Sequence, residues 1–542
     1  MLVIRKIHVF SLFVFFSTAV FFASCSEDDN GEEVDKTVVL SFEQSSFPEN
    51  LDAAGGSFTI EIDWAYTQWD LTTEVVEGDG FISTINPSGG GSIKEEETST
   101  FVEIAYAANS QTTENRQKLL LSSLTHEVSE EIFLKQAGRV AQATTKLILD
   151  PSVVHQTITG FGGANMIWGA DYLTESEMDM AFGTGEDHLG LSIYRVRLPS
   201  SRSDWAGLVN SVKMANSRNV KVLASPWSPP AEWKSNNSTN GGGYLLKEHY
   251  ADFANYINEY IQFMADNGAV IDAVSIQNEP DWKVDYEGCE YSAAEMYDFV
   301  RNYAGVIENA KVVAAESLNS NQAYTNDILN DATAADNLDI VGGHLYGGGL
   351  AVYPLAYEKE KQIWMTEYLL NLNSGNVPSN WTEYTDQETI WDETMEMLEG
   401  IHSAMAFDWN AYIWWYIRRY YSFLGDGNSG TQRGKILKRG YAFSQYSKFI
   451  RPGYQRIDIS PEGVSTLKMT AYSGDGNIVI VIINPSEYSV RTVEVALPSS
   501  ATSAVSYTTS SGLNRKLNDN ILNNDKVIVE LPKESVTTIV LQ

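Results

Sequence analysis

Between residues 157 and 416, eight short apolar runs follow one another along the chain, with stretches of helical spacing between them. This alternation is typical of βα units, in which crossover helices join parallel strands. Eight such units predict an α/β fold, a (β/α)8 barrel of the TIM type. The expected strands are Thr157–Phe161, Leu191–Leu198, Val220–Ser225, Ala273–Gln277, Lys311–Ala315, Ile340–His344, Gln362–Thr366 and Tyr412–Tyr416, and the expected helices include Leu246–Asn267, Ala293–Ile307 and Thr382–Ala406.

A glutamate follows two of these strands. Glu279 comes after the fourth, where Pro280 ends the strand because it cannot donate a ladder hydrogen bond. Glu367 comes directly after the seventh, 88 residues later. Because a barrel gathers the C-terminal ends of its strands at one face, we expect both carboxylates to face one pocket. Such a pair suits glycoside hydrolysis, with one group as acid and the other as nucleophile or base.

Tryptophans are concentrated in the barrel segment, which holds 11 of the 13 in the chain. Flat aromatic faces pack against the apolar faces of pyranose rings. Trp364 and one of Trp414 and Trp415 are expected in the barrel wall. The tryptophans expected to bind a sugar chain are Trp168, Trp227, Trp233, Trp282 and Trp415.

All-β segments flank the barrel, which is expected over residues 147–452. Residues 38–138 alternate apolar and polar side chains between glycine-rich turns, which predicts a separate Ig-like sandwich. Its motifs resemble those of a BACON domain, and the resemblance implies a spacer, with carbohydrate binding as the alternative. Residues 453–542 return to strands and predict a side β-sandwich, which the strand at 145–150 is expected to join.

The N-terminus has the pattern of an exported protein. Arg5 and Lys6 precede an apolar run that is shorter than a typical transmembrane helix. Small residues and Cys25 follow it. This arrangement resembles a bacterial lipoprotein signal, with an acidic export signal like that of Bacteroidetes lipoproteins. It implies a signal peptide over residues 1–24, acylation of Cys25, a tether over 25–37 and a surface-exposed outer-membrane lipoprotein. The alternative is a plain secretory signal with an incidental cysteine.

Composition excludes several classes of function. Acidic residues outnumber basic ones 71 to 37, and the net charge of −34 disfavours nucleic acid as a partner. Cys289 is the only cysteine besides Cys25, so the mature chain has no disulfide framework and no cysteine-rich metal site. The seven histidines are scattered, and we expect no metal, no cofactor and a monomeric protein.

From about Leu147 to the C-terminus, the chain resembles glycoside hydrolase family 30, most closely the bacterial glucuronoxylanases of subfamily 8. The resemblance implies a barrel with a side sandwich and a retaining mechanism, with Glu279 as acid/base and Glu367 as nucleophile. Asn278 is then placed to bond the sugar 2-hydroxyl and Tyr346 to donate to Glu367, with Arg197 and His344 in support. The matching segments are Gly160–Asn165, Trp227–Pro230, Gln277–Trp282, Gly342–Tyr346, Trp364–Glu367, Trp414–Arg419, Lys438–Tyr441 and Arg451–Tyr454.

The same resemblance implies that the substrate is the polysaccharide xylan with glucuronate branches. In the family, an arginine and a tyrosine after the eighth strand recognise the uronate, and they correspond to Arg419 and Tyr421. The bidentate fork of arginine suits a carboxylate. The chain departs from the pattern at Leu369 and Leu372, where the family has a tyrosine and a serine that serve the same uronate. Whether the branch is strictly required therefore stays open on the sequence.

Two alternatives to a xylanase stay open on the sequence. One is a family 30 enzyme for another β-glycan such as a β-1,6-glucan, which the arginine pair at Arg418 and Arg419 disfavours. The other is a surface glycan-binding lipoprotein without catalysis, which the retained Glu279, Glu367 and Asn278 disfavour.

Overall fold

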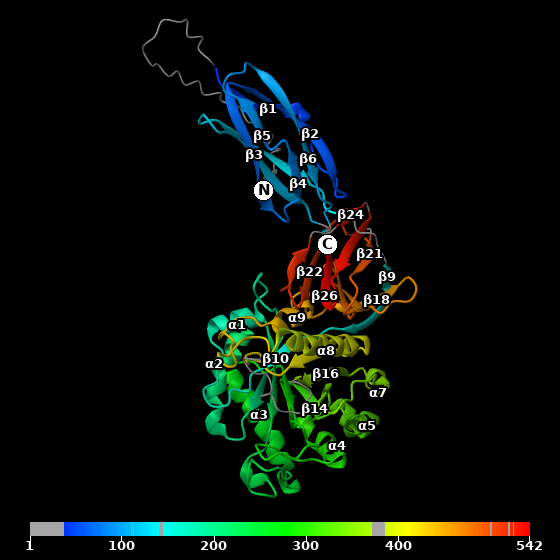
Figure 1. Cartoon of the computed structure of the whole chain (residues 1–542). Coiled ribbons are helices and arrows are strands. Elements are labelled where there is room, and N and C mark those ends of the chain that lie inside the picture. The colour runs from blue at the N-terminus through cyan, green and yellow to red at the C-terminus, as the bar shows by residue number, and fades with distance from the viewer. Residues whose placement is uncertain are drawn as a thin grey trace, which may run out of the picture. The chain divides into compact units, whose positions relative to one another are not determined.

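The computed structural model describes residues 37–109, 111, 113–139, 145–370, 385–498, 501–518, 521–523 and 525–542. The expected signal peptide, Cys25 and nearly all of the expected tether lie outside these residues. The chain divides into two compact units, Met1–Arg139 and Val140–Gln542, which are drawn in Figure 1. Among the described residues, no helix is both long and apolar enough to span a membrane.

The second unit contains a closed barrel of eight parallel strands, which confirms the predicted fold (Figure 1). In order around the barrel, the strands are β10 (Gly160–Ala164), β11 (Ile193–Leu198), β12 (Lys221–Pro226), β13 (Ala273–Ser275), β14 (Lys311–Ser317), β15 (Ile340–His344), β16 (Gln362–Glu367) and β17 (Ala411–Trp414). The helices are α1 (Glu175–Phe182), α2 (Ala206–Asn216), α3 (Tyr250–Asp266), α4 (Ala293–Asn302), α5 (Ala323–Asn330), α6 (Ala332–Asp336), α7 (Pro354–Glu358), α8 (Gln387–Ala406) and α9 (Lys438–Ser447).

The first barrel strand begins three residues later than expected. Thr157 is the last residue of β9 (Thr145–Thr157), which pairs outside the barrel, and only from Gly160 does the chain pair with β11 and β17. The predicted strand Thr157–Phe161 therefore combined the end of one strand with the start of the next. The predicted helix Ala293–Ile307 likewise breaks at Tyr303 into α4 and a short 3-10 turn.

The barrel interior is filled by one apolar layer to which most strands contribute. Trp364 belongs to this layer and is 2% exposed, with its indole N–H donated to Gln362 at 2.9 Å. The neighbouring tryptophan of β17, Trp414, packs instead in the core outside this layer, stacked on Phe423. Since the interior is packed, a substrate has access to the barrel only from its ends. The layer consists of Ile193, Leu223, Ala273, Val313, Ile340, Trp364, Ala411 and Ile413.

A ten-stranded sheet accompanies the barrel in the same unit, and its two halves share one hydrophobic core. β9 lies within this sheet between β18 (Gln455–Pro461) and β21 (Arg491–Ala496). The other strands are β19 (Lys468–Gly474), β20 (Asn477–Asn484), β22 (Ala504–Ser510), β23 (Lys516–Asn518), β24 (Ile521–Asn523), β25 (Lys526–Leu531) and β26 (Ser535–Leu541).

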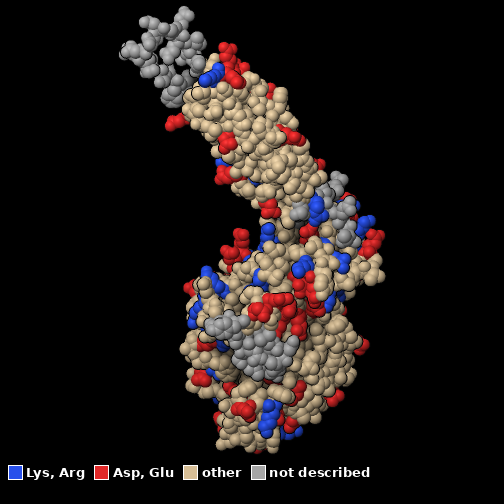
Figure 2. Space-filling model, viewed as in Figure 1, with Lys and Arg blue, Asp and Glu red and all other residues tan. Residues whose placement is uncertain are grey.

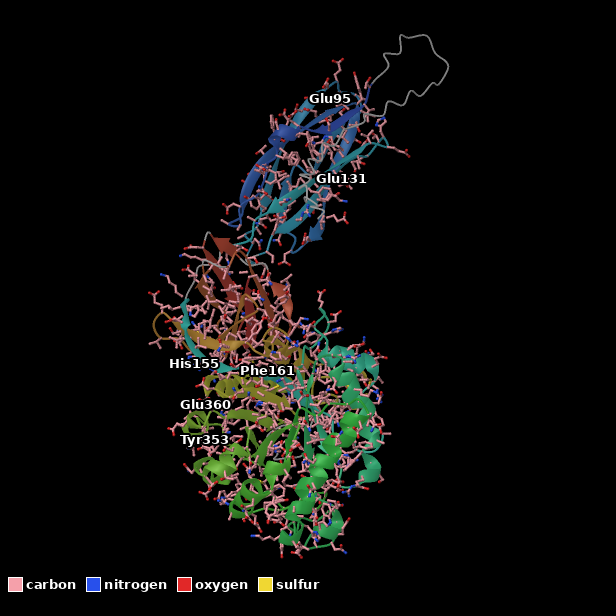
Figure 3. The ribbon with its side chains drawn as sticks, turned by 180° about the vertical axis from the view of Figure 1, so that it is seen from behind. Glu95, Glu131, His155, Phe161, Tyr353 and Glu360 are labelled. Carbon is pink, nitrogen blue, oxygen red and sulfur yellow. The ribbon has the colours of Figure 1, made fainter. Side chains whose placement is uncertain are left out.

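Polar side chains meet at the seam between this sheet and the barrel. His155 of β9 lies 3.6 Å from Asp408, which follows α8, and 3.5 Å from Asp458 of β18. Phe161 of β10 packs against Phe443 and Tyr446 of α9, and Figure 3 labels it near His155. The segment from β9 to β10 thus links the two parts of this unit.

The first unit is built from two four-stranded sheets around one core. The sheets have the orders β1-β2-β6-β4 and β5-β3-β7-β8. Trp64 and Trp69 are 5% and 1% exposed in this core, so both pack inside the domain and neither presents its face to a sugar. The strands are β1 (Val39–Phe42), β2 (Gly56–Ala65), β3 (Thr67–Glu77), β4 (Ile82–Asn86), β5 (Gly89–Ser92), β6 (Thr98–Tyr106), β7 (Asn115–Ser123) and β8 (Ser129–Gln136).

Acidic side chains gather over α8, as Figure 2 shows. Partial burial raises the pKa of the Glu534 carboxyl. The negative charges of Asp392 and Glu388 on this helix, and of Glu487, raise it further. Like charges in one place repel an acidic polymer. A carboxylated ligand is therefore disfavoured on this face.

Candidate active site

Glu279 and Glu367 lie at the C-terminal end of the barrel, with His344 between their strands. Glu279 follows β13, His344 ends β15 and Glu367 ends β16. One carboxylate oxygen of each glutamate and one ring nitrogen of His344 all lie within 4.8 Å of one another. Retaining glycosidases hold their two carboxyl groups about 5–5.5 Å apart, whereas inverting enzymes need more room for a water molecule. The close spacing matches the retaining arrangement.

The backbone at Glu279 is bent into an unusual conformation. Its φ is 47°, in the left-handed region that residues other than glycine rarely adopt. Two hydrogen bonds hold this bend, from the Glu279 N–H to the Glu316 carbonyl at 3.0 Å and from the Asn278 N–H to the Pro226 carbonyl at 2.9 Å. Backbone strain of this kind is concentrated at functional sites. Here it accompanies the turn that carries Asn278 and Glu279 beyond β13.

Arg195 of β11 connects the polar side chains of the site. Its guanidinium is fully buried and donates to Glu367 at 2.5 Å and to the Asn278 side-chain carbonyl at 2.7 Å. It also lies 3.2 Å from Glu316 of β14. Because the Asn278 side-chain oxygen accepts from Arg195, its NH2 group is the part left to contact a ligand, as a donor.

Two further groups contact the carboxylates. The Tyr346 hydroxyl donates to Glu367 at 2.9 Å, and His344 Nδ1 lies 2.9 Å from Glu279. Burial alone would lower the pKa of His344, but the charge of Glu367 and the contacts with Glu279 and Glu316 raise it to about 9. His344 is therefore a cation at neutral pH and donates to Glu279.

The remaining acidic groups respond to the same cations. Burial would raise the pKa of Glu316, yet Arg195 and His344 lower it to about 2, so Glu316 is ionised. Burial and the charge of Glu279 raise the pKa of Glu367 above its ordinary value, although the charges of His344 and Arg195 oppose this shift. Glu279, His344 and Glu367 are close enough to share a metal ion, but the positive charges of His344 and Arg195 make the cluster unfavourable for one.

The charge on His344 makes stability depend on pH. The folded pKa, about 9, is above the ordinary value of 6.5, so this contribution is fully present below about pH 6.5 and is lost as the pH rises through about 9. We expect the thermal unfolding midpoint to fall between these values, and to fall less in His344→Gln. The control is His402→Gln, because burial lowers the pKa of His402 to about 4 and this residue stays uncharged throughout. Equal slopes for His344→Gln and the wild type would contradict the assignment.

Three of the expected tryptophans form one cluster beside this network. Trp227 is buried, and its ring lies 5.8 Å from that of Trp168 and 6.0 Å from that of Trp415. The Arg195 guanidinium lies 5.0 Å over the Trp227 ring, which connects the cluster to the carboxylates. Trp168 is 37% exposed and can present a face to a ligand.

Trp282 and Trp233 lie in different settings. Trp282 is 47% exposed in the turn after Glu279, where its backbone N–H donates to the Glu279 carbonyl at 3.1 Å. Trp233 is not in contact with this group, because its ring stacks on His249 at 5.8 Å and meets Tyr256 of α3 edge-on. The structure therefore places Trp233 against His249 and α3 and not in the cluster around Trp227.

Arg419 and Tyr421 line a hollow of about 540 Å³ after β17. Arg419 lies 2.7 Å from Asp171 and stacks 4.1 Å from the Tyr416 ring centroid. Asp171 also binds Arg418, which pairs in turn with Glu177 at 2.6 Å. Arg418 is thus held in an ion-pair network, while Arg419 is the partly exposed member.

The two leucines that depart from the expected pattern differ in what the structure describes. Leu369 is 7% exposed and packs in the main core, so it offers no polar contact to the hollow. Leu372 lies outside the described residues.

Comparison with known proteins agrees with this geometry. The sequence model of the glycosyl hydrolase family 30 TIM-barrel domain matches residues 194–407. The protein named glucuronoxylanase XynC of Bacillus subtilis strain 168 is 36% identical over 409 residues, which cover 74% of this chain and 92% of that relative. The chain belongs to glycoside hydrolase family 30. It is therefore a glycoside hydrolase.

Solved structures and a more distant relative extend the comparison within family 30. The subfamily 8 xylanase of Clostridium acetobutylicum is 33% identical with a TM-score of 0.64, over 73% of this chain and 99% of that one. An endo-1,6-β-D-glucanase of Trichoderma harzianum is 25% identical over 54% of this chain and 60% of its own length. The family thus includes enzymes named for different β-glycans.

Some residues of this family 30 site were not identified from the sequence. Arg197 was expected as a supporting residue, but it lies 3.9 Å from Glu287 and 4.5 Å from the Trp168 ring, while Arg195 contacts Glu367. Strand alternation places both arginines on one face, so the signal for Arg195 was present. Glu316 was also missed, although it lies at the end of the fifth barrel strand.

Proposed function

We propose that the protein is a retaining endo-β-1,4-xylanase that prefers xylan carrying glucuronate branches. The observation that carries the retaining mechanism is the close approach of Glu279 and Glu367 at the mouth of the barrel. The substrate is supported by similarity to a protein named glucuronoxylanase and to a subfamily 8 xylanase.

In the proposed mechanism, Glu279 protonates the glycosidic oxygen while Glu367 attacks the anomeric carbon and forms a covalent glycosyl intermediate. Glu279 then takes a proton from the water that releases the sugar. Arg195 and Tyr346 support the attack because both donate to Glu367, and such bonds favour its ionised form. The Asn278 amide, oriented by Arg195, can donate to the sugar 2-hydroxyl.

Recognition of the uronate is proposed for Arg419 and Tyr421. Both line the hollow after β17, and Arg419 keeps donors beyond those engaged by Asp171 and the Arg418 carbonyl. A uronate must therefore share Arg419 with Asp171. This competition, together with the buried Leu369, supports a preference for the branch and not a strict requirement.

The activity test compares glucuronoxylan with undecorated linear xylan. The wild type is expected to cleave both, with the higher kcat/KM on the decorated polymer and products that carry the uronate. Arg419→Ala should lower the ratio of the two kcat/KM values by about tenfold, because a hydrogen bond to a charged group contributes about 1.5–3 kcal/mol. The control is Arg202→Ala, an exposed arginine in the loop after β11 that pairs with Glu259 of α3.

Each other outcome has a definite meaning for the substrate. If Arg419→Ala leaves the ratio of the two kcat/KM values unchanged, the hollow does not recognise the uronate. If the protein cleaves neither xylan but cleaves a β-1,6-glucan, the proposed substrate is wrong. The assignment to family 30 would still stand.

We also propose that the mature protein begins at an acylated Cys25 and is held on the cell surface by this outer-membrane anchor, with residues 38–138 as a BACON-like spacer. The support is the order of charged, apolar and small residues before Cys25. Metabolic labelling with a fatty-acid probe should mark the wild type and not Cys25→Ser. Labelling of both would refute the anchor.

A further inference from the structure

The loops after β12 and β13 are joined to each other at the mouth of the barrel. We call residues 234–245 and 282–290 the paired loops. Their backbones are joined by three hydrogen bonds, from Gly241 to Tyr286 at 3.0 Å, from Gly288 to Thr239 at 3.0 Å and from Glu290 to Gly243 at 2.7 Å. Two segments from different βα units therefore form a single surface.

Lys234, the first residue of the paired loops, connects the two loops through its buried side chain. Its side chain is buried, 3% exposed, and its ammonium donates to the carbonyls of Gly288 and Thr239, one from each loop. Burial lowers the pKa of Lys234, and the two carbonyls replace the water it has lost. An internal cross-link of this kind makes the loops a preformed wall, which binds a ligand with little loss of loop entropy.

Three aromatic side chains project from the paired loops into solvent. Tyr244, Trp282 and Tyr286 are 51%, 47% and 56% exposed. Large aromatic side chains dominate the energetics of cores and interfaces. A group of exposed rings on a rigid support therefore marks a binding surface.

Tyr286 lies within the electric field of the carboxylates. The protein covers part of the Tyr286 ring, which raises the pKa of its phenol, and the charges of Glu279 and Glu367 raise it further. Trp282 is three residues from Glu279 and hydrogen-bonded to its carbonyl. The surface thus continues directly from the two glutamates.

The barrel places this surface and Arg419 on opposite sides of the carboxylates. β13 is the fourth strand and β17 the eighth in a closed ring of eight, so these two strands lie across the barrel from each other. Trp282 and Tyr286 follow β13, and Arg419 follows β17. A sugar chain that crosses the mouth between these sides passes over Glu279 and Glu367.

We propose that the paired loops bind the leaving-group side of the glycan, with Trp282 and Tyr286 stacking on the sugars beyond the scissile bond. This inference rests on the proposed function. Glu279, as the acid, must touch the oxygen of the leaving sugar. The surface that extends from Glu279 away from Arg419 is therefore where the leaving sugars lie.

The test separates leaving-group binding from chemistry by using two substrates. One is an aryl β-xylobioside, whose small leaving group does not reach the paired loops, and the other is xylohexaose. Trp282→Ala and Tyr286→Ala are each expected to lower kcat/KM on xylohexaose about tenfold, the order of magnitude for loss of one buried aromatic contact. On the aryl glycoside, both variants should stay within about twofold of the wild type, since the same rings are not used.

Two further variants serve as controls. Tyr286→Phe keeps the ring and should retain nearly all activity on xylohexaose. Tyr488→Ala removes a tyrosine that is 90% exposed in the loop between β20 and β21, and it should leave kcat/KM on both substrates unchanged. Unfolding midpoints equal to that of the wild type would show that the variants are folded.

Equal losses on both substrates, or no loss on either, would overturn the inference. If the wild type cleaves no xylan substrate, the proposed function fails separately. The same variants are then compared on a β-1,6-gluco-oligosaccharide and its aryl glycoside, where the inference predicts the same difference between the two substrates.

Discussion

Glu367→Gln is expected to lower kcat on the cleaved glycan by about 10⁴-fold or more, as loss of a catalytic nucleophile does in other hydrolases. The amide has nearly the shape of the carboxylate but cannot attack the anomeric carbon. It can still accept the hydrogen bond from Tyr346, which lies 2.9 Å from the carboxylate in the wild type. Oligosaccharide binding, measured by calorimetry, should therefore persist while turnover is lost.

The matched control for this variant is Glu393→Gln. Glu393 is a buried glutamate with an arginine partner, Arg439 at 3.4 Å, but it lies on α8 and not on a barrel strand. It tests whether replacing any buried, ion-paired glutamate stops catalysis. If kcat of Glu367→Gln stays within tenfold of the wild-type value, Glu367 is not the nucleophile.

Glu279→Ala is expected to lower kcat/KM on xylan by about 10²–10⁴-fold, the usual contribution of a general acid/base. An aryl glycoside with an acidic phenol as leaving group needs no protonation, so its glycosyl-enzyme should still form. Azide, which needs no general base, should then accept the sugar and restore turnover. The product to identify by NMR is a glycosyl azide with retained anomeric configuration.

The configuration of that azide distinguishes the roles of the two carboxylates. Retention means that Glu279 was the acid/base and that Glu367 still formed the covalent intermediate. Inversion would mean that azide replaced a missing nucleophile, which would exchange the assignments of Glu279 and Glu367. No effect of azide would exclude both roles for Glu279.

Periodicity was sufficient to predict the barrel, because each strand is a short apolar run between longer helical stretches. It was insufficient at Thr157–Phe161, where two consecutive strands of different sheets are separated only by Ile158 and Thr159. No glycine or proline marks the boundary between them before Gly160. Local patterns record that a segment is extended, but the partner strand is decided by tertiary pairing.

The site shows the same limit at a finer scale. The positions of Glu279 and Glu367 follow from counting strand ends. The choice of Arg195 over Arg197 depends on depth within the barrel, since both point to the same face of β11. Trp233 resembles the other tryptophans in sequence, but its contacts with His249 and α3 depend on a fold-level arrangement that composition does not encode.

The position of β9 has a consequence for how the protein is made. The ribosome produces this strand before the barrel, whereas its neighbours β18 and β21 emerge only after the barrel is complete. Until then, both edges of β9 lack partners, and unpaired edges expose a nascent chain to aggregation. Expression of the second unit should therefore start before Thr145 and run to the C-terminus, since a fragment that ends with the barrel leaves β9 without a sheet.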